Sequence, residues 1–369
     1  MRITFLMPCD NLTGGNRVVA IYAQQLMARG HEVLVVTCAP DRLSAREKVR
    51  AVVRGDWQNL RNDGRSQAGH IELSGVAHKV LERPRAISAA DVPDADIIIA
   101  TWWETAVWMH GMPASKGRKV HLIQGYEVWL GPQAVSRVHA ALQLPNLKIA
   151  ISSDLKSTIE EKLGDLGIAV VPNAVDLTQF NAPSRGRQQT PTVGFVYAVA
   201  AIKGADICAR ACELARHQFP QLKVVAFGAD QPSSEVPLPA GTEFFYRPKQ
   251  TELRQIYARC DTWLFGSRLD SFGLPILEAM ACRTPVIAVP IGAAPDLLGD
   301  GTGVIVAKES PEEMAAAIVA MCRQTPGEWQ QRSDRAYCKA HSYSWEDATT
   351  RLLEILRRAW VSDGTATVW

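Results

Sequence analysis

Two acidic residues, Asp270 and Glu278, form a D-x7-E arrangement beside a glycine-containing loop. The apolar run that ends at Phe265 has the pattern of a buried strand, and Pro275 stands where the next helix would begin. The amides at such a helix start favour a phosphate or another anion. Carboxylates accept hydrogen bonds from hydroxyls, as acids do on a ribose. The spacing therefore indicates a site for a sugar joined through a diphosphate to a nucleoside. An acid at a helix start beside a second, solvated acid is the alternative.

The segments around these acids alternate between buried-strand patterns and helical patterns in both halves of the chain. Such alternation predicts parallel sheets with helices on both faces. A polar segment bounded by prolines, 183–191, indicates a domain boundary. We therefore predict an α/β fold with two doubly wound Rossmann-like domains that face each other across a cleft. The first would comprise residues 1–183 and the second residues 191–344.

A glycine-containing loop follows the first apolar run, and a helical pattern extends from 17 to 29. Gly14 and Gly15 lie in this loop and would let the backbone approach a ligand. The glycines do not form G-x-G-x-x-G, and the second predicted strand ends at Thr37 rather than at an acid. This disfavours a nicotinamide-dependent oxidoreductase.

The composition is that of an ordinary globular protein. The chain has 369 residues, 47% of them hydrophobic, and a formal net charge of +2, which does not indicate nucleic-acid binding. Its eight cysteines form no C-x-x-C pair, and no run approaches the roughly 20 apolar residues of a membrane span. With no pattern of a signal peptide, we expect a cytoplasmic protein. The arginine-rich segment 41–65 leaves two interpretations open, a solvated face and peripheral contact with anionic lipid headgroups.

The stretch D-S-F-G-L-P-I-L-E-A-M-A-C-R-T-P-V-I-A resembles the E-x7-E signature of the retaining nucleotide-sugar glycosyltransferases of family four, which have the GT-B fold. Short motifs similar to those of the family occur, in the same order as in the family, across most of the chain. They are Ala150-Ile151-Ser152-Ser153, Val171-Pro172-Asn173-Ala174-Val175-Asp176 with Phe180, Lys203-Gly204, and Ser344-Trp345. The resemblance implies that the second domain binds the donor and the first binds the acceptor. It also implies that residues 345–369 form a helix that crosses back to the first domain.

The resemblance implies roles for three residues that we predict to be catalytic. Lys203 would offset the charge of the diphosphate, Asp270 would contact hydroxyls of the transferred sugar, and Glu278 would hold the ribose hydroxyls. Asp270 is one methylene shorter than the family's usual glutamate. The predicted donor-binding residues are Glu278 together with Gly14, Gly15, Tyr246, Arg247, Arg268, Ser271, Phe272, Gly273 and Leu274.

One departure from the family concerns charge. The family usually has Gly-Arg after the first strand of the second domain, where this chain has Tyr197 and Ala198. The lost arginine leaves negative charge of the diphosphate to be offset elsewhere, and Arg247 and Arg268 are the candidates. Amides near Phe272 would assist Lys203.

The predicted acceptor-binding residues are Trp102, Trp103, Gln124 and Glu127. Tryptophans at the carboxyl end of a strand suit a wall that faces a carbohydrate, although packing between helix and sheet is an equal alternative. Family members often have His-Gly where Gln124 stands. A glutamine cannot act as a base at neutral pH, so no histidine-dependent role is expected there. The Gln-x-Tyr-Glu pattern is similar to rhamnosyltransferase-like members.

Asp94 and Asp96 form a D-x-D pattern, which other glycosyltransferases use for a metal. The pattern is short and common, so we expect it to mark the polar start of a strand. We predict a metal-independent site without a cofactor.

Together these features predict a retaining glycosyltransferase. It would move a sugar, rhamnose or another hexose, from a nucleoside-diphosphate sugar to a hydroxyl of a glycan or lipid-linked acceptor in cell-surface polysaccharide synthesis. Two alternatives stay open: a non-catalytic protein that binds a nucleotide sugar or glycan, and a sugar-nucleotide epimerase of GT-B fold.

Overall fold

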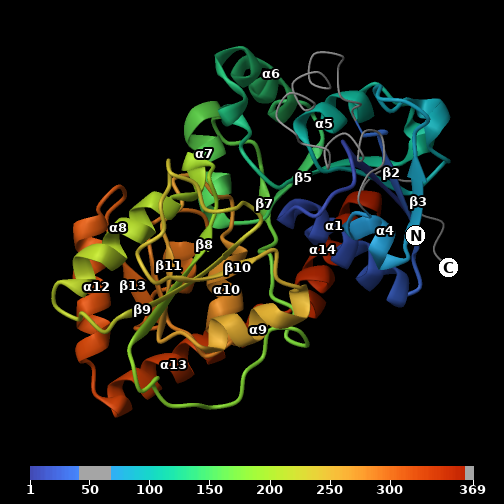
Figure 1. Cartoon of the computed structure of the whole chain (residues 1–369). Coiled ribbons are helices and arrows are strands. Elements are labelled where there is room, and N and C mark those ends of the chain that lie inside the picture. Colours follow the sequence, from blue (N-terminus) through green and yellow to red (C-terminus); the bar gives the residue numbers. More distant parts are fainter. Residues whose placement is uncertain (41–67, 362–369) are drawn as a thin grey trace. The chain divides into compact units, whose positions relative to one another are not determined.

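The computed structural model describes residues 1–40 and 68–361 (Figure 1). The segment 41–65, for which membrane contact was one interpretation, lies outside the described residues. The chain divides into two compact units. The first contains Met1–Ile151, Lys156–Val171 and Trp345–Trp369, and the second contains Ser152–Leu155 and Pro172–Ser344.

The first unit is built on a seven-stranded parallel sheet with the order β3-β2-β1-β4-β5-β6-β7. The direction of winding therefore reverses between β1 and β4, and a ligand crevice is expected at the carboxyl ends of strands on either side of such a reversal. The strands are β1 (Arg2–Met7), β2 (Glu32–Thr37), β3 (Ala77–Val80), β4 (Ile97–Ala100), β5 (Arg118–Ile123), β6 (Leu147–Ala150) and β7 (Ala169–Val170).

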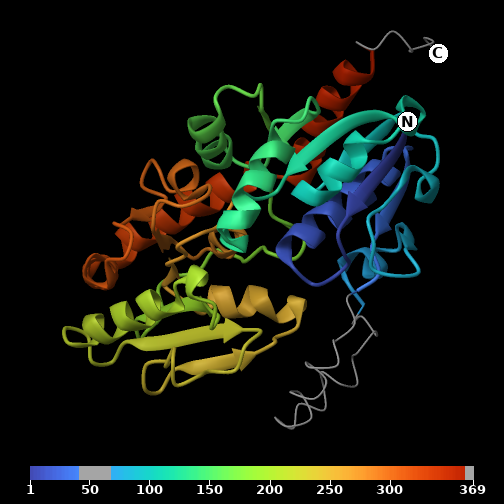
Figure 2. The same cartoon turned by 90° about the horizontal axis from the view of Figure 1, so that it is seen from above.

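Helices lie along the faces of this sheet, which explains why its central strands are apolar runs rather than alternating patterns (Figure 2). All four residues of β4 are buried. The helices are α1 (Gly14–Ala28), α4 (His70–Ser74), α5 (Trp103–His110), α6 (Pro132–Leu142), α7 (Ser153–Leu163) and α14 (Trp345–Val361), with 3₁₀ turns η1 (Ala89–Asp91), η2 (Ala114–Lys116) and η3 (Val128–Leu130).

The last helix, α14, packs against α1 within the first unit. Its apolar face includes Leu352 and Leu356, both fully buried. The rings of Tyr22 and Trp345 meet edge to face with centroids 5.3 Å apart, and Arg29 donates a hydrogen bond to the carbonyl of Glu346 at 2.8 Å. The C-terminal helix thus belongs to the unit formed by the start of the chain.

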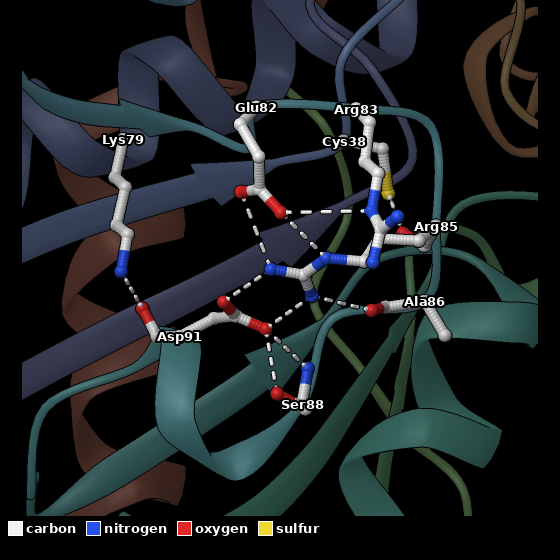
Figure 3. A network of polar contacts seen from close by, with 8 residues as sticks. All are labelled: Cys38, Lys79, Glu82, Arg83, Arg85, Ala86, Ser88 and Asp91. Carbon is white, nitrogen blue, oxygen red and sulfur yellow. Dashed lines mark hydrogen bonds and ion pairs between the residues drawn. The ribbon is translucent and has the colours of Figure 1, made fainter.

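An ion-pair network fastens the loop that follows β3 (Figure 3). The Arg85 guanidinium donates to both carboxylate oxygens of Asp91 at 2.6 and 2.7 Å, and also to Glu82 at 3.0 Å. The backbone and hydroxyl of Ser88 donate to Asp91 as well. Arg85 holds the pKa of Asp91 well below its ordinary value, although burial opposes this. The network therefore stabilises the fold as long as Asp91 is ionised.

The second unit contains a six-stranded parallel sheet with the order β10-β9-β8-β11-β12-β13, so its winding reverses between β8 and β11. The strands are β8 (Thr192–Tyr197), β9 (Lys223–Gly228), β10 (Glu243–Tyr246), β11 (Thr262–Phe265), β12 (Val286–Ala288) and β13 (Gly303–Ile305). The helices are α8 (Ala205–Arg216), α9 (Gln250–Ala258), α10 (Leu274–Ala281), α11 (Ala294–Leu297), α12 (Pro311–Arg323) and α13 (Pro326–His341), with the 3₁₀ turn η4 (Ala201–Lys203).

The second unit begins at Pro172, upstream of the segment 183–191 in which the sequence suggested a boundary. Local contacts explain the difference. The amide of Val175 donates to the carbonyl of Tyr343, and the ring of Phe180 meets that of Tyr257 edge to face at 6.0 Å. These contacts attach residues 172–182 to the second unit before the proline-bounded segment is reached.

Candidate functional site

The reversal between β8 and β11 brings Lys203 and Asp270 together in the second unit. Lys203 lies at the end of η4, after β8, and Asp270 lies in the loop after β11. Lys203 Nζ is 2.9 Å from Asp270 Oδ2. Gly204 permits this approach, since its φ is +62° and a Cβ there would lie 1.9 Å from the carbonyl oxygen of Gly266. The loops after the two strands therefore meet at this glycine, and the D-x7-E loop lies beside the predicted phosphate cation.

The other oxygen of the Asp270 carboxylate binds the start of α10. Asp270 Oδ1 accepts hydrogen bonds from the amides of Phe272 at 3.2 Å and Gly273 at 2.8 Å. Gly273 has a φ of +85°, and a Cβ there would lie 3.0 Å from both Ile276 Cδ1 and Phe265 Cζ, so this position requires glycine. The two amides that the sequence suggested for a diphosphate thus donate to Asp270 in this structure.

Glu278 is held by a residue that sequence analysis did not single out for the site. Its side chain is buried, and its Oε2 accepts a hydrogen bond from the hydroxyl of Tyr257 on α9 at 2.8 Å. Aromatic neighbours fix that tyrosine: Trp263 at 4.5 Å and Phe227 at 5.6 Å between ring centroids. The carboxylate of Glu278 is therefore oriented by a packed tyrosine, for which the spacing of Leu253, Ile256 and Tyr257 on one face of α9 is a signal in the sequence.

Arg268, one candidate to replace the missing arginine of the family, is paired with acidic side chains within the second unit. Its guanidinium contacts the carboxylates of Asp206 at 2.8 Å and Glu309 at 2.7 Å, and it donates to the carbonyl of Ala201 at 2.6 Å. Two carboxylates already offset its charge. Its backbone amide donates to the carbonyl of Ile202 at 2.9 Å, so Arg268 joins the D-x7-E loop to the turn that carries Lys203.

The remaining predicted donor residues of the second unit lie at different places along its sheet. Tyr246 ends β10 and is 44% exposed, and the Arg247 guanidinium lies 5.2 Å from the centroid of its ring. Arg247 also donates to the carbonyl of Ala229 at 3.1 Å. The carbonyl of Ser271 accepts a hydrogen bond from Ser152 at 2.7 Å, and Leu274 is the first residue of α10.

In the first unit, Gly15 and Gln124 come together beside the reversal between β1 and β4. Helix α1 begins at Gly14, three residues before the predicted start at Arg17. A Cβ on Gly15 would lie 3.4 Å from Gln124 Oε1, an ordinary van der Waals contact. This Gln124 oxygen is buried and has no hydrogen-bond partner in the described part of the chain. A polar group of this kind is available to a hydroxyl.

The tryptophans of the first unit divide between surface and core. Trp102 precedes α5 and meets Trp129 of η3 at a centroid distance of 6.3 Å and an interplanar angle of 62°. Trp129 is 43% exposed and was not among the predicted residues. Trp103 is buried, and the Arg137 guanidinium lies 4.7 Å from its ring centroid, which is the packing alternative that the sequence left open.

Glu127 is the one acid of the predicted acceptor set. Its side chain is only 3% exposed, and burial raises its pKa to about 8. The carboxyl is therefore mostly neutral at pH 7 and can donate a hydrogen bond, which a carboxylate cannot do. Burial also lowers the pKa of His121 to about 3, so this histidine is uncharged inside β5.

The D-x-D acids lie at the amino ends of the strands. Asp94 pairs with Lys116 at 3.0 Å and Asp96 with Arg2 at 2.9 Å, where they line a cavity of about 750 Å³ that Trp360 also borders. Within residues 1–40 and 68–361, no group of three histidine, cysteine or acidic side chains is placed to hold a metal ion.

Two family models match consecutive parts of the chain. The model described as Glycosyltransferase Family 4 matches residues 12–179, and the model described as Glycosyl transferases group 1 matches residues 190–324. The chain belongs to glycosyltransferase family 4. The two matches follow the order of the two units and include the D-x7-E loop.

Curated relatives match over part of their length. The D-inositol 3-phosphate glycosyltransferase of Mycobacterium marinum is 29% identical over 221 residues, which cover 54% of this chain and 46% of the relative. The enzyme of the same name from Mycobacterium leprae is 31% identical over 189 residues, 47% of this chain and 43% of the relative. The chain thus spans about half the length of the curated relatives it matches.

Solved structures show the fold. Sucrose-phosphate synthase from Thermosynechococcus elongatus has a TM-score of 0.72 at 16% identity and covers 98% of this chain and all of its own. Anabaena Alr3699/HepE in complex with UDP-glucose has a TM-score of 0.73 at 18% identity, with 97% of this chain and 100% of that chain covered. The two Rossmann-like units of this chain form a GT-B fold. In the described part of the chain, no helix is long and apolar enough to cross a bilayer.

Proposed function

We propose that this protein is a retaining glycosyltransferase whose second unit binds a nucleoside-diphosphate sugar and whose first unit binds the acceptor. One observation carries the proposal: Lys203 and the D-x7-E loop meet at the reversal of the sheet in a chain of family 4. Ligands of open parallel sheets bind at such reversals, and a lysine beside a helix start favours phosphate.

The departing diphosphate requires stabilisation of its developing charge. Lys203 supplies a compact positive charge, and the Leu274 amide, as the first of α10, has no partner within its own helix. A donor directed at developing charge contributes roughly 3–4 kcal/mol to the transition state. With these donors, no metal is needed to offset the charge. In retaining members of this family the leaving phosphate oxygen takes the proton of the acceptor, so no protein nucleophile is assigned.

Two carboxylates would bind the hydroxyls of the donor. Glu278 is assigned to the ribose because Tyr257 already orients its carboxylate at 2.8 Å. Asp270 is assigned to the transferred sugar, since it lies in the loop beside Lys203. Tyr246 and Arg247, at the end of β10, are assigned to the base. Structures at low identity include one solved with UDP-glucose, so we propose a uridine nucleotide and a hexose.

The first unit presents groups suited to a hydroxylated acceptor. Aromatic rings bind the apolar face of a sugar, and Trp102 and Trp129 form an accessible aromatic pair. Gln124 and the neutral Glu127 offer hydrogen bonds to hydroxyls. We therefore propose a glycan or a lipid-linked glycan as the acceptor. Rhamnose, suggested by the Gln-x-Tyr-Glu pattern, has no counterpart among the relatives and structures described above.

A non-catalytic protein that binds nucleotide sugars is the second candidate. The pairing of Arg268 with two carboxylates favours this second candidate, because it leaves Lys203 with fewer cationic partners to offset the charge of a departing diphosphate. An epimerase would convert the donor without any acceptor.

All eight cysteines are free, which suits a reducing compartment such as the cytoplasm.

A screen of nucleoside diphosphates and their sugars by melting shift, followed by a transfer assay, tests the proposal. We expect one nucleotide sugar to raise the melting temperature and to lose its sugar, with retention of configuration, only when an acceptor glycan is added. Conversion of the donor without acceptor would indicate an epimerase. Binding without turnover would support the second candidate, and no melting shift with any nucleotide would contradict both.

A further inference from the structure

The carboxylate of Asp270 occupies the hydrogen-bond donors that a phosphate would use. It accepts from Lys203 Nζ at 2.9 Å, from the Gly273 amide at 2.8 Å and from the Phe272 amide at 3.2 Å. An ammonium group and two amides at a helix start form a typical set of phosphate ligands. Asp270 therefore acts as an internal anion on the site assigned to the diphosphate.

The side chain of Asp270 can change partners while its backbone stays in place. On one side the amide of Leu269 donates to the carbonyl of Ile202 at 3.2 Å, and on the other the carbonyl of Phe272 accepts from Ala293 at 2.9 Å. The side chains of Lys203 and Asp270 are 43% and 19% exposed, so the ion pair lies near the surface. Ion pairs of this exposure are weak, and a ligand with two phosphates can replace them.

We propose that Asp270 makes the site discriminate between a nucleotide sugar and the bare nucleoside diphosphate, and that it thereby promotes product release. This inference rests on the proposed function. When phosphates take Lys203 and the amides, the carboxylate must find other hydrogen-bond donors. The hydroxyls of the attached sugar provide them. A bare diphosphate provides none, so Asp270 competes with the product for Lys203 but is satisfied in the complex with the donor.

The test compares Asp270→Asn with the wild type. Asparagine keeps an oxygen that can accept from Phe272 and Gly273, but it loses the charge that pairs with Lys203. We expect UDP and inorganic pyrophosphate to bind about fivefold more tightly to the variant, as when a partly exposed ion pair no longer competes. The affinity for UDP-glucose should rise less, or fall, because asparagine keeps only one acceptor oxygen and loses the second one, which would accept from the sugar hydroxyls. The ratio of the two dissociation constants would therefore change in favour of UDP.

Two further variants make the test specific. Glu243→Gln removes the same charge from the second unit, but Glu243 pairs with Arg259 at the first residue of β10, the end of the strand opposite Tyr246. It should leave all three dissociation constants unchanged. In a Lys203→Ala background, Asp270→Asn should no longer tighten the binding of UDP or pyrophosphate, because there is no ammonium group left to release.

Isothermal titration of the full chain with UDP, UDP-glucose and pyrophosphate measures these constants. Equal affinities for wild type and Asp270→Asn, weaker pyrophosphate binding to the variant, or the same gain in Glu243→Gln would each overturn the inference while leaving donor binding intact. If neither nucleotides nor pyrophosphate bind to any variant, the inference and the proposed function both fail.

Discussion

Replacement of Glu127 by glutamine should stabilise the first unit, and the effect should grow with pH. The ordinary pKa of a glutamate is 4.5, and burial raises that of Glu127 to about 8. Between these values the folded chain holds a proton that the unfolded chain has released. Each pH unit in this window therefore lowers the stability of the wild type by about 1.4 kcal/mol.

The magnitude follows from the position of pH 7 in the window. From pH 4.5, the ordinary pKa of a glutamate, to pH 7 the free energy of unfolding of the wild type falls by roughly 3 kcal/mol relative to a chain whose side chain at this position never ionises. The loss reaches its maximum once the pH exceeds the raised pKa, since the folded carboxyl then ionises too. Glutamine keeps the shape and stays neutral, so Glu127→Gln should melt several degrees above the wild type at pH 7 and match it near pH 4.

Thermal and urea unfolding of the full chain at pH 4.5, 7 and 8.5 would measure the effect. Glu161→Gln, an exposed position on α7, provides the matched control and should show no pH-dependent difference from the wild type. A Glu127→Gln variant that is less stable than the wild type at pH 8.5, or whose difference is the same at every pH, would refute the reasoning.

Four other changes test separate parts of the account. Lys203→Ala should lower kcat by about two to three orders of magnitude while the melting temperature of the free protein changes little; a wild-type kcat would exclude its role in charge stabilisation. Glu278→Ala should weaken binding of the nucleoside diphosphate, and unchanged affinity by titration would count against the ribose assignment. Trp129→Ala should raise the KM for the acceptor and leave the dissociation constant of the donor unaltered, whereas an effect on the donor alone would be contrary to the assignment. Asp91→Asn should cost about 2 kcal/mol of stability at pH 7 by breaking the pair with Arg85. The wild type should lose this same contribution as the pH falls below about 4, where the carboxyl of the unfolded chain takes up protons. Equal acid sensitivity of the wild type and the variant would disprove this role of the ion pair.

The fold could be predicted because it depends on local patterns. Buried parallel strands produce continuous apolar runs, and such runs marked nearly every central strand of both sheets. The D-x7-E motif could be placed at a strand–loop–helix unit because Pro275 and Gly273 have positional preferences that sequence alone reveals. Helix α1 begins earlier than predicted because Gly14 and Gly15, expected in a loop, join the helix at its N-terminus.

The partners within the site could not be predicted, because they come from distant segments. Glu309 and Asp206 bind Arg268 from separate elements, and no local pattern shows that this arginine is already paired. Tyr257 reaches Glu278 from another helix. Trp129 meets Trp102 because the two lie in the segments that follow the carboxyl ends of the neighbouring parallel strands β5 and β4. Each of these contacts is set by tertiary packing rather than by spacing along the chain.

The most direct test of the central claim is the phosphorus NMR spectrum of the bound nucleotide sugar. If Lys203 and the loop before α10 hold the diphosphate, the resonances should shift on binding to the wild type and should shift less in a folded Lys203→Ala variant. Identical bound-state resonances in the two proteins would show that the phosphates lie elsewhere.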